Sequence, residues 1–182
     1  AGSIESGSTT SDFDAQEKAR GHSIDTVIAS VELKNCHINL IDTAGYADFR
    51  GPTLSALNAV ETVAVVVNAV NGIEHGTRRL MHYARERRLA RLLVINHIDA
   101  DGLDLAALVD SLREEFGKVS LPVNLPAEGA RKVLDCFFHA DGDTDFSSLA
   151  EAHRNIIDQV VEINETVMEH YLDTGEGSLG RE

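Results

Sequence analysis

Two short apolar runs, the first rich in β-branched residues, constrain the fold more than any other feature of this 182-residue sequence. They are VAVVVNAV at 63–70 and RLLVIN at 91–96, and an arginine-rich stretch of helical length lies between them. Such runs are typical of strands that are buried on both faces of a parallel sheet, with a helix as the crossover connection. We therefore predict a mostly parallel sheet that helices cover on both faces.

The rest of the chain predicts further strands and helices in alternation. Two more strands are expected, TVIASVEL at 26–33 and CHINLID at 36–42, and helices are expected over 52–60, 78–91 and 103–118. This order favours an α/β fold whose ligand site lies at the carboxyl ends of the strands.

The character of the sequence changes after Gly117. Two short strands are expected within 121–138, followed by a long helix over 149–172 with Leu149, Ile156, Val160, Ile163 and Val167 on one apolar stripe. We assign residues 1–119 to a core domain and residues 120–182 to a small α+β subdomain that is appended or inserted.

Composition indicates a soluble globular protein, with 43% apolar and 25% charged residues. No signal peptide or membrane span is recognised, so a cytoplasmic location without a membrane partner is expected. Cys36 and Cys136 are widely separated and are expected to be small buried hydrophobic residues.

The charge is strongly negative and unevenly distributed. The net charge of −14 argues against binding of phosphate backbones by the chain as a whole, yet six arginines fall within residues 78–91. A solvated helix face is the simpler explanation of that stretch, and a binding role is the alternative.

Polar residues end two of the predicted strands, in NLIDTAG at 39–45 and VINHID at 94–99. Asp42 could hold a hydrated Mg²⁺, and the backbone N–H of Gly45 could approach a phosphate. Asn96 and Asp99 could together bind a purine edge, with the Asp accepting two parallel N–H bonds. Turn-forming residues that simply end a strand are the alternative for each motif.

These motifs, taken in order, resemble the GTPase domain of translation elongation factor G and its paralogues. DFDAQEKARGHSI at 12–24 resembles the first switch, with its E-K-x-R-G-I-T-I sequence, and NLIDTAGYADF resembles I-D-T-P-G-H-V-D-F of the second. NHID resembles the guanine-reading N-K-x-D, and residues 122–136 with the last helix resemble the subdomain inserted in that family's GTPase domain. The resemblance implies a three-layer α/β/α fold of the P-loop NTPase type.

The resemblance also assigns roles to matching positions. Ser23 and Asp42 would bind Mg²⁺, the Gly45 N–H would contact the γ-phosphate of GTP, and Asn96, His97 and Asp99 would form the guanine site of GTP and GDP. Tyr46 stands where the family carries the histidine that positions the attacking water, so Tyr46 and Gly45 are the expected catalytic residues.

Several positions depart from the family pattern. Ala44 replaces a proline of the second switch, and His97 replaces the lysine whose stem packs along the base. No G-x-x-x-x-G-K-[ST] loop is present, so the chain is expected to be an internal piece of a larger factor and to be inactive alone.

Two functions are compatible with this pattern. The first is a GTP-hydrolysing factor whose switches couple γ-phosphate loss to conformational change on the ribosome during translocation. The second is a diverged paralogue that hydrolyses slowly and acts as a nucleotide- and ribosome-binding regulatory module. The resemblance implies contacts with ribosomal RNA and with the stalk proteins of the large subunit, the latter through an acidic face on the helix at 149–172.

Overall fold

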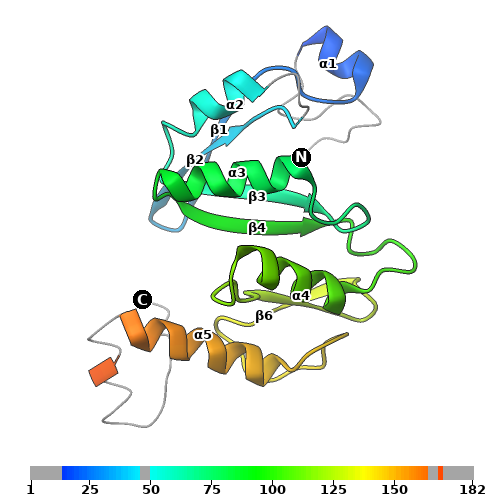
Figure 1. The fold of residues 1–182 in the computed structure, drawn as a ribbon, viewed down its shortest axis with the longest axis vertical. Coiled ribbons are helices and arrows are strands. Elements are labelled where there is room, and N and C mark those ends of the chain that lie inside the picture. The colour runs from blue at the N-terminus through cyan, green and yellow to red at the C-terminus, as the bar shows by residue number, and fades with distance from the viewer. Residues whose placement is uncertain (1–13, 46–49, 164–167, 170–182) are drawn as a thin grey trace. The chain divides into compact units, whose positions relative to one another are not determined.

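The computed structural model describes residues 14–45, 50–163 and 168–169, and Figure 1 shows the course of the chain through its helices and strands. The elements are, in chain order, α1 (Ala15–Arg20), β1 (Val27–Leu33), β2 (Cys36–Asp42), α2 (Arg50–Ala56), β3 (Thr62–Asn68), α3 (His75–Glu86), β4 (Ala90–Asn96), α4 (Leu105–Phe116), β5 (Asn124–Ala127), β6 (Lys132–Asp135) and α5 (Leu149–Ile163). The expected strands and helices are therefore confirmed, and α1 is an addition to them. None of the helices in the described ranges has the length and hydropathy of a membrane span.

The chain divides into two compact units. The first comprises Ala1–Val65 with Arg78–Leu92, and the second comprises Val66–Thr77 with Leu93–Glu182. The first unit contains the β1–β2 hairpin, and the second contains the β5–β6 hairpin with α4 and α5. The domain boundary expected between residues 119 and 120 stays a prediction.

Strands β1 and β2 form an antiparallel hairpin whose register runs from Val27 opposite Asp42 to Leu33 opposite Cys36. Residues directly opposite each other point to the same face, so the pairs alternate between two faces.

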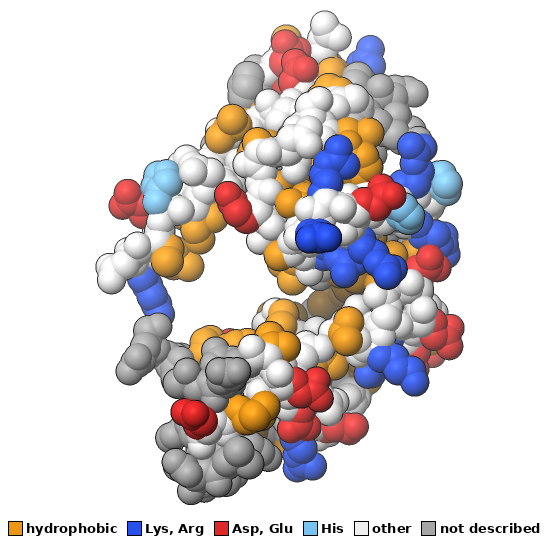
Figure 2. Space-filling model, turned by 60° about the vertical axis from the view of Figure 1, so that its left-hand side comes forward, with side chains coloured by type: hydrophobic (Ala, Val, Ile, Leu, Met, Phe, Trp, Pro, Cys, Tyr) orange, Lys and Arg blue, Asp and Glu red, His pale blue; other side chains and the backbone are white. Residues whose placement is uncertain are grey.

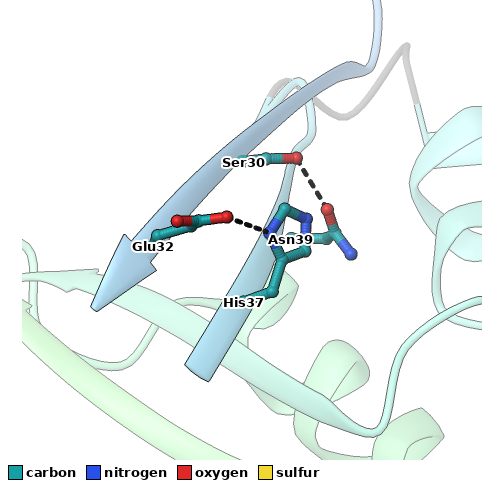
Figure 3. A network of polar contacts seen from close by, with 4 residues as sticks. All are labelled: Ser30, Glu32, His37 and Asn39. Atoms are coloured by element: carbon teal, nitrogen blue, oxygen red, sulfur yellow. Dashed lines mark hydrogen bonds and ion pairs between the residues drawn. The ribbon is translucent and has the colours of Figure 1, made fainter. Parts of the chain in front are cut away.

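One face of the β1–β2 hairpin carries the Ser30–Asn39 hydrogen bond of 2.7 Å and the 3.7 Å contact between His37 Nδ1 and Glu32 Oε1 (Figure 3). The other face carries four exposed apolar side chains, those of Val31, Leu33, Ile38 and Leu40.

Strands β3 and β4 pair with each other, and their backbone bonds show a parallel arrangement. The Ala90 N–H donates to the Glu61 carbonyl at 3.1 Å where both strands begin, and the Ala69 N–H donates to the Asn96 carbonyl at 2.9 Å where both end. Helix α3 is the connection between them. The predicted crossover unit is therefore present, and the polar residues that follow the two strands lie at the same end of the pair.

The expectation that both faces of these strands are buried is wrong for the residues that the structure describes. Val63, Val65 and Val67 of β3 are buried, but Val66 on the opposite face is 61% exposed. Leu92 and Val94 of β4 are also exposed. A continuous apolar run leaves open which face is covered, because side chains alternate between the two faces of a strand.

The second unit contains a hydrophobic cluster of Leu125, Cys136, Leu149, Ala152 and Ile156. Burial, with a smaller contribution from the charge of Asp135, raises the pKa of the Cys136 thiol to about 11. This cysteine is therefore a small buried hydrophobic residue, as the sequence predicts.

Two other expectations about burial are wrong. Cys36 is exposed, because it begins β2 at the tip of the hairpin opposite Leu33. Ile163, expected on the apolar stripe of α5, is 81% exposed, because it is the last residue of that helix and lies beyond the cluster. Residues 164–167, with Val167, and the expected last residues 170–172 of this helix fall outside the described residues.

Replacing Gly142 by alanine is expected to lower the free energy of unfolding by about 2–3 kcal/mol. The φ angle of Gly142 is +154°, and an added Cβ would lie 2.8 Å from Leu134 Cδ1 and 3.2 Å from Leu149 Cδ2. Urea denaturation would measure the loss, with Gly76→Ala in α3 as the control, since a Cβ there meets no atom within 4 Å. Equal unfolding midpoints for the two variants would contradict this prediction.

Candidate functional site

A buried glutamate shapes the segment that carries Ser23. Glu17 is only 1% exposed, and its Oε1 accepts the N–H of Ile24 at 2.9 Å and of Asp25 at 3.1 Å. Its Oε2 accepts the N–H of Asp14 at 3.3 Å. The bonds from Ile24 and Asp25 lower the pKa of Glu17 most, and they outweigh the opposing effect of burial. Glu17 is therefore an ionised acceptor that ties α1 to the chain on both sides of it.

Helix α1 begins and ends with standard caps. Asp14 accepts the Gln16 N–H at 2.6 Å and, with Glu17, forms a capping box, while the Gly21 N–H donates to the Glu17 carbonyl at 2.7 Å. The D-x-x-E spacing at 14–17 is the sequence signal for this start, and Glu17 could have been found from it.

Replacing Glu17 by glutamine is expected to speed hydrogen exchange at the Ile24 and Asp25 amides roughly tenfold, because a neutral amide oxygen is a weaker acceptor. In the unchanged protein the lowered pKa keeps Glu17 ionised, so protection should persist at neutral pH. It should be lost only as the pH falls through the folded-state pKa, which lies below the ordinary value of 4.5. Exchange measured by NMR would test this, with Glu32→Gln in the exposed hairpin as the control. Unchanged exchange at Ile24 and Asp25 would show that the carboxylate does not hold them.

Ser23 is half-buried and lies in the loop that Glu17 holds. Only three residues separate it from Val27, which begins β1 opposite Asp42. The two residues expected to bind Mg²⁺ are therefore carried by neighbouring segments of the first unit.

Asp42 ends β2 with an exposed side chain, and the turn after it is anchored to α2. Ala44 is buried, and its carbonyl accepts the Thr53 hydroxyl at 3.2 Å. The substitution of proline by Ala44 thus leaves a turn that a tertiary hydrogen bond holds. Gly45 is exposed, and the position of a Cβ on it is open space, so its backbone is accessible to a ligand. Tyr46 lies outside the described residues.

Asn96, His97 and Asp99 lie together at the end of β4 in the second unit. Asn96 is the last residue of the strand, and its carbonyl accepts the Ala69 N–H at 2.9 Å. His97 has a φ of 58°, which turns the chain out of the strand, and the Ala100 N–H donates to its carbonyl at 3.3 Å. The side chains of all three residues are exposed, so this edge is open to a ligand.

Asp99 also lines an open hollow of about 680 Å³ in the second unit. Two of the other carboxylates lining it have structural tasks. Asp104 caps α4 by accepting the Ala107 N–H, and Asp145 accepts the N–H groups of Gly129 and Ala130. A hollow lined by carboxylates disfavours the phosphates of a nucleotide but can accept the N–H groups of a base.

Within the described ranges, no three His, Cys, Asp or Glu side chains are arranged to hold an ion. Mg²⁺ keeps several waters and is usually bound by one or two protein oxygens together with substrate phosphates. The Ser23 hydroxyl and the Asp42 carboxylate are oxygen donors of this kind.

Comparison with known proteins matches residues 1–174 to the family described as the elongation factor Tu GTP binding domain. The chain belongs to this family. It is 31% identical to the elongation factor G-like protein of Thermotoga maritima, over 89% of this chain and 26% of that protein. It is 35% identical to peptide chain release factor 3 of Trichodesmium erythraeum, over 64% of this chain and 22% of that protein.

A solved structure from Thermus thermophilus superposes with a TM-score of 0.78 and 28% identity, over 97% of this chain and 29% of that one. The fold is therefore that of a translation-factor GTPase domain, as the resemblance predicts. The chain spans about a quarter of the length of the relatives that it matches.

Proposed function

We propose that the full-length protein is a translation GTPase that couples GTP hydrolysis to conformational change on the ribosome. The observation that carries the proposal is the position of Asn96, which ends the parallel strand β4, and Asp99, which follows it, both with exposed side chains. This is the edge at which open α/β sheets bind ligands. The family match, which covers this edge and both switch segments, supports the proposal.

In this proposal, each motif contacts a different part of GTP. Asn96 and Asp99 bind the guanine edge, and the imidazole of His97 stacks along the base. The Gly45 N–H contacts the γ-phosphate. Tyr46 positions the attacking water.

Mg²⁺ would be held by Ser23 and Asp42 and would supply positive charge to the phosphates. Glu17 would fix the backbone next to Ser23, so the serine hydroxyl is positioned before the nucleotide binds.

The role on the ribosome is proposed to be that of an elongation factor G-like protein acting in translocation. The exposed carboxylates of Glu151, Asp158 and Glu162 on α5 would face basic stalk proteins of the large subunit. A slowly hydrolysing regulatory paralogue is the second candidate, and the specific observation that favours it is the exchange of three family residues for Ala44, Tyr46 and His97.

The test is a pair of measurements on the full-length protein. Titration with fluorescent GTP and Mg²⁺ should show saturable binding that GDP competes with and ATP does not. Phosphate release should then rise on addition of ribosomes. Binding without ribosome-stimulated release would support the regulatory paralogue, and equal competition by ATP would contradict guanine recognition.

A further inference from the structure

The exposed side of α3 is basic, in a chain whose formal net charge is −14. Helix α3 buries Thr77, Met81 and Ala84, so its exposed positions fall on the opposite side. Among these positions are His75, Arg78, Arg79, His82 and Arg85, which we call the α3 basic face. Figure 2 shows Arg and Lys side chains close together with His side chains beside them on the face that it draws.

The helical spacing concentrates this charge. Arg78, His82 and Arg85 follow one another at intervals of four and three residues, so they lie along one line of the helix. Arg78 and Arg85 are two turns apart, which is roughly 10 Å along the axis. The acidic side chain on this side of the helix, Glu86, lies 3.6 Å from His82 Nδ1. The carboxylate of Glu86 therefore lies next to the imidazole of His82.

Arg87, which follows α3 directly, makes contacts within the protein. The guanidinium of Arg87 lies 3.5 Å from the ring centroid of Tyr83, and its Nε donates to Asn58 Oδ1 at 3.2 Å. Arg87 therefore contacts Tyr83 of α3 and Asn58, and it is not part of the α3 basic face.

We propose that the α3 basic face binds the phosphate backbone of RNA, an inference that rests on the proposed function because it takes ribosomal RNA as the partner. The face carries three arginines, whose planar guanidinium groups bind phosphate oxygens in pairs. Protein partners are usually held by buried aromatic or aliphatic anchors, and α3 exposes no large apolar side chain in the described structure. The chemistry of the face therefore favours a phosphate backbone over an acidic protein.

The C-terminal part of the chain carries the opposite charge. From Asp135 onward there are twelve acidic residues and only two arginines, and RNA repels carboxylates. An RNA backbone is therefore attracted to the α3 basic face and kept away from the acidic C-terminal part of the chain.

The first test measures the affinity of the full-length protein for purified ribosomes as a function of KCl concentration. In the variant Arg79→Gln/Arg85→Gln, the slope of log affinity against log salt should become shallower by about 1.5, since each phosphate contact contributes about 0.7–0.9. The control Arg131→Gln/Arg154→Gln removes the same charge from two exposed arginines of the second unit and should keep the wild-type slope. Equal slopes for the two variants would overturn the inference.

The second test identifies the class of partner. A photoreactive group on Arg79→Cys, in a Cys36→Ser background because Cys36 is exposed, should label ribosomal RNA. Labelling of ribosomal protein alone, or no labelling, would overturn the inference. GTP affinity is measured in parallel and should be unchanged in the variants. If the unchanged protein bound no GTP, the proposed function would fail while the salt slope and the crosslink still reported on α3.

Discussion

Replacing Asp99 by asparagine in the full-length protein is expected to weaken GTP binding by about 10²–10⁴-fold. The proposed carboxylate accepts two N–H groups of guanine, from the ring N1 and the exocyclic amine. Hydrogen bonds to a charged group contribute about 1.5–3 kcal/mol each, and asparagine offers one oxygen and one NH₂ in place of two oxygens. Its NH₂ would face a guanine N–H, so two donors would lie against each other.

The same variant should bind xanthosine triphosphate better than GTP, because xanthine carries a carbonyl oxygen where guanine carries the amine. Competition against fluorescent nucleotides would measure both affinities. Asp101→Asn, also exposed a short way along the chain from Asp99, serves as the control and should change GTP affinity less than about threefold. A similarly small change in Asp99→Asn would remove Asp99 from the guanine site.

The sequence pattern predicted the strands well, because strand formation here depends on the residue types within each short segment. The β-branched residues of β3 and β4 favour a pleated backbone whatever covers them. Burial depends on distant parts of a chain, and this is why the exposure of Val66, Leu92 and Val94 was not predicted. The spacing of apolar residues shows which side chains share a face and leaves open what packs on it.

The positions of the expected guanine and phosphate motifs at strand ends were predictable, because each is a short sequence at the end of an apolar run. The structure places Asn96 at the end of β4, Asp99 after β4 and Gly45 after β2, and the roles of these residues stay predictions. The role of Glu17 was missed because it depends on hydrogen bonds to residues outside its own helix. Glu17 accepts N–H groups seven and eight residues further along the chain, and only the capping box at 14–17 gives a local sign of it.

Single exposed residues show the same limit. Cys36 is of a residue type that is usually buried, but it lies at the tip of the β1–β2 hairpin. Ile163 continues the helical spacing of the apolar stripe, but it lies beyond the hydrophobic cluster on which α5 packs. In both cases the pattern identifies the element correctly, and the position along the element decides the burial.

Replacing Tyr46 by histidine is expected to raise the rate of single-turnover GTP hydrolysis on ribosomes roughly a hundredfold, which is about what one well-placed polar group contributes to catalysis. Tyr46 follows Gly45 directly and, in the proposed function, stands in place of the histidine that positions the attacking water; it lies outside the described residues. A histidine can offer a ring nitrogen to the attacking water and, when protonated, a positive charge near the γ-phosphate. A tyrosine, whose pKa is about 10, offers a neutral phenol on a longer ring.

The nucleotide affinity of Tyr46→His should stay nearly unchanged, because the proposed function places this side chain next to the γ-phosphate and not on the guanine. Rapid mixing at saturating GTP, with phosphate release as the signal, would separate the two effects. Tyr46→Phe is the matched control, since it removes only the hydroxyl and should not raise the rate. A lower rate in Tyr46→His would mean that the phenol itself takes part in catalysis or in gating, and the slowly hydrolysing paralogue would then lose the substitution that most favours it.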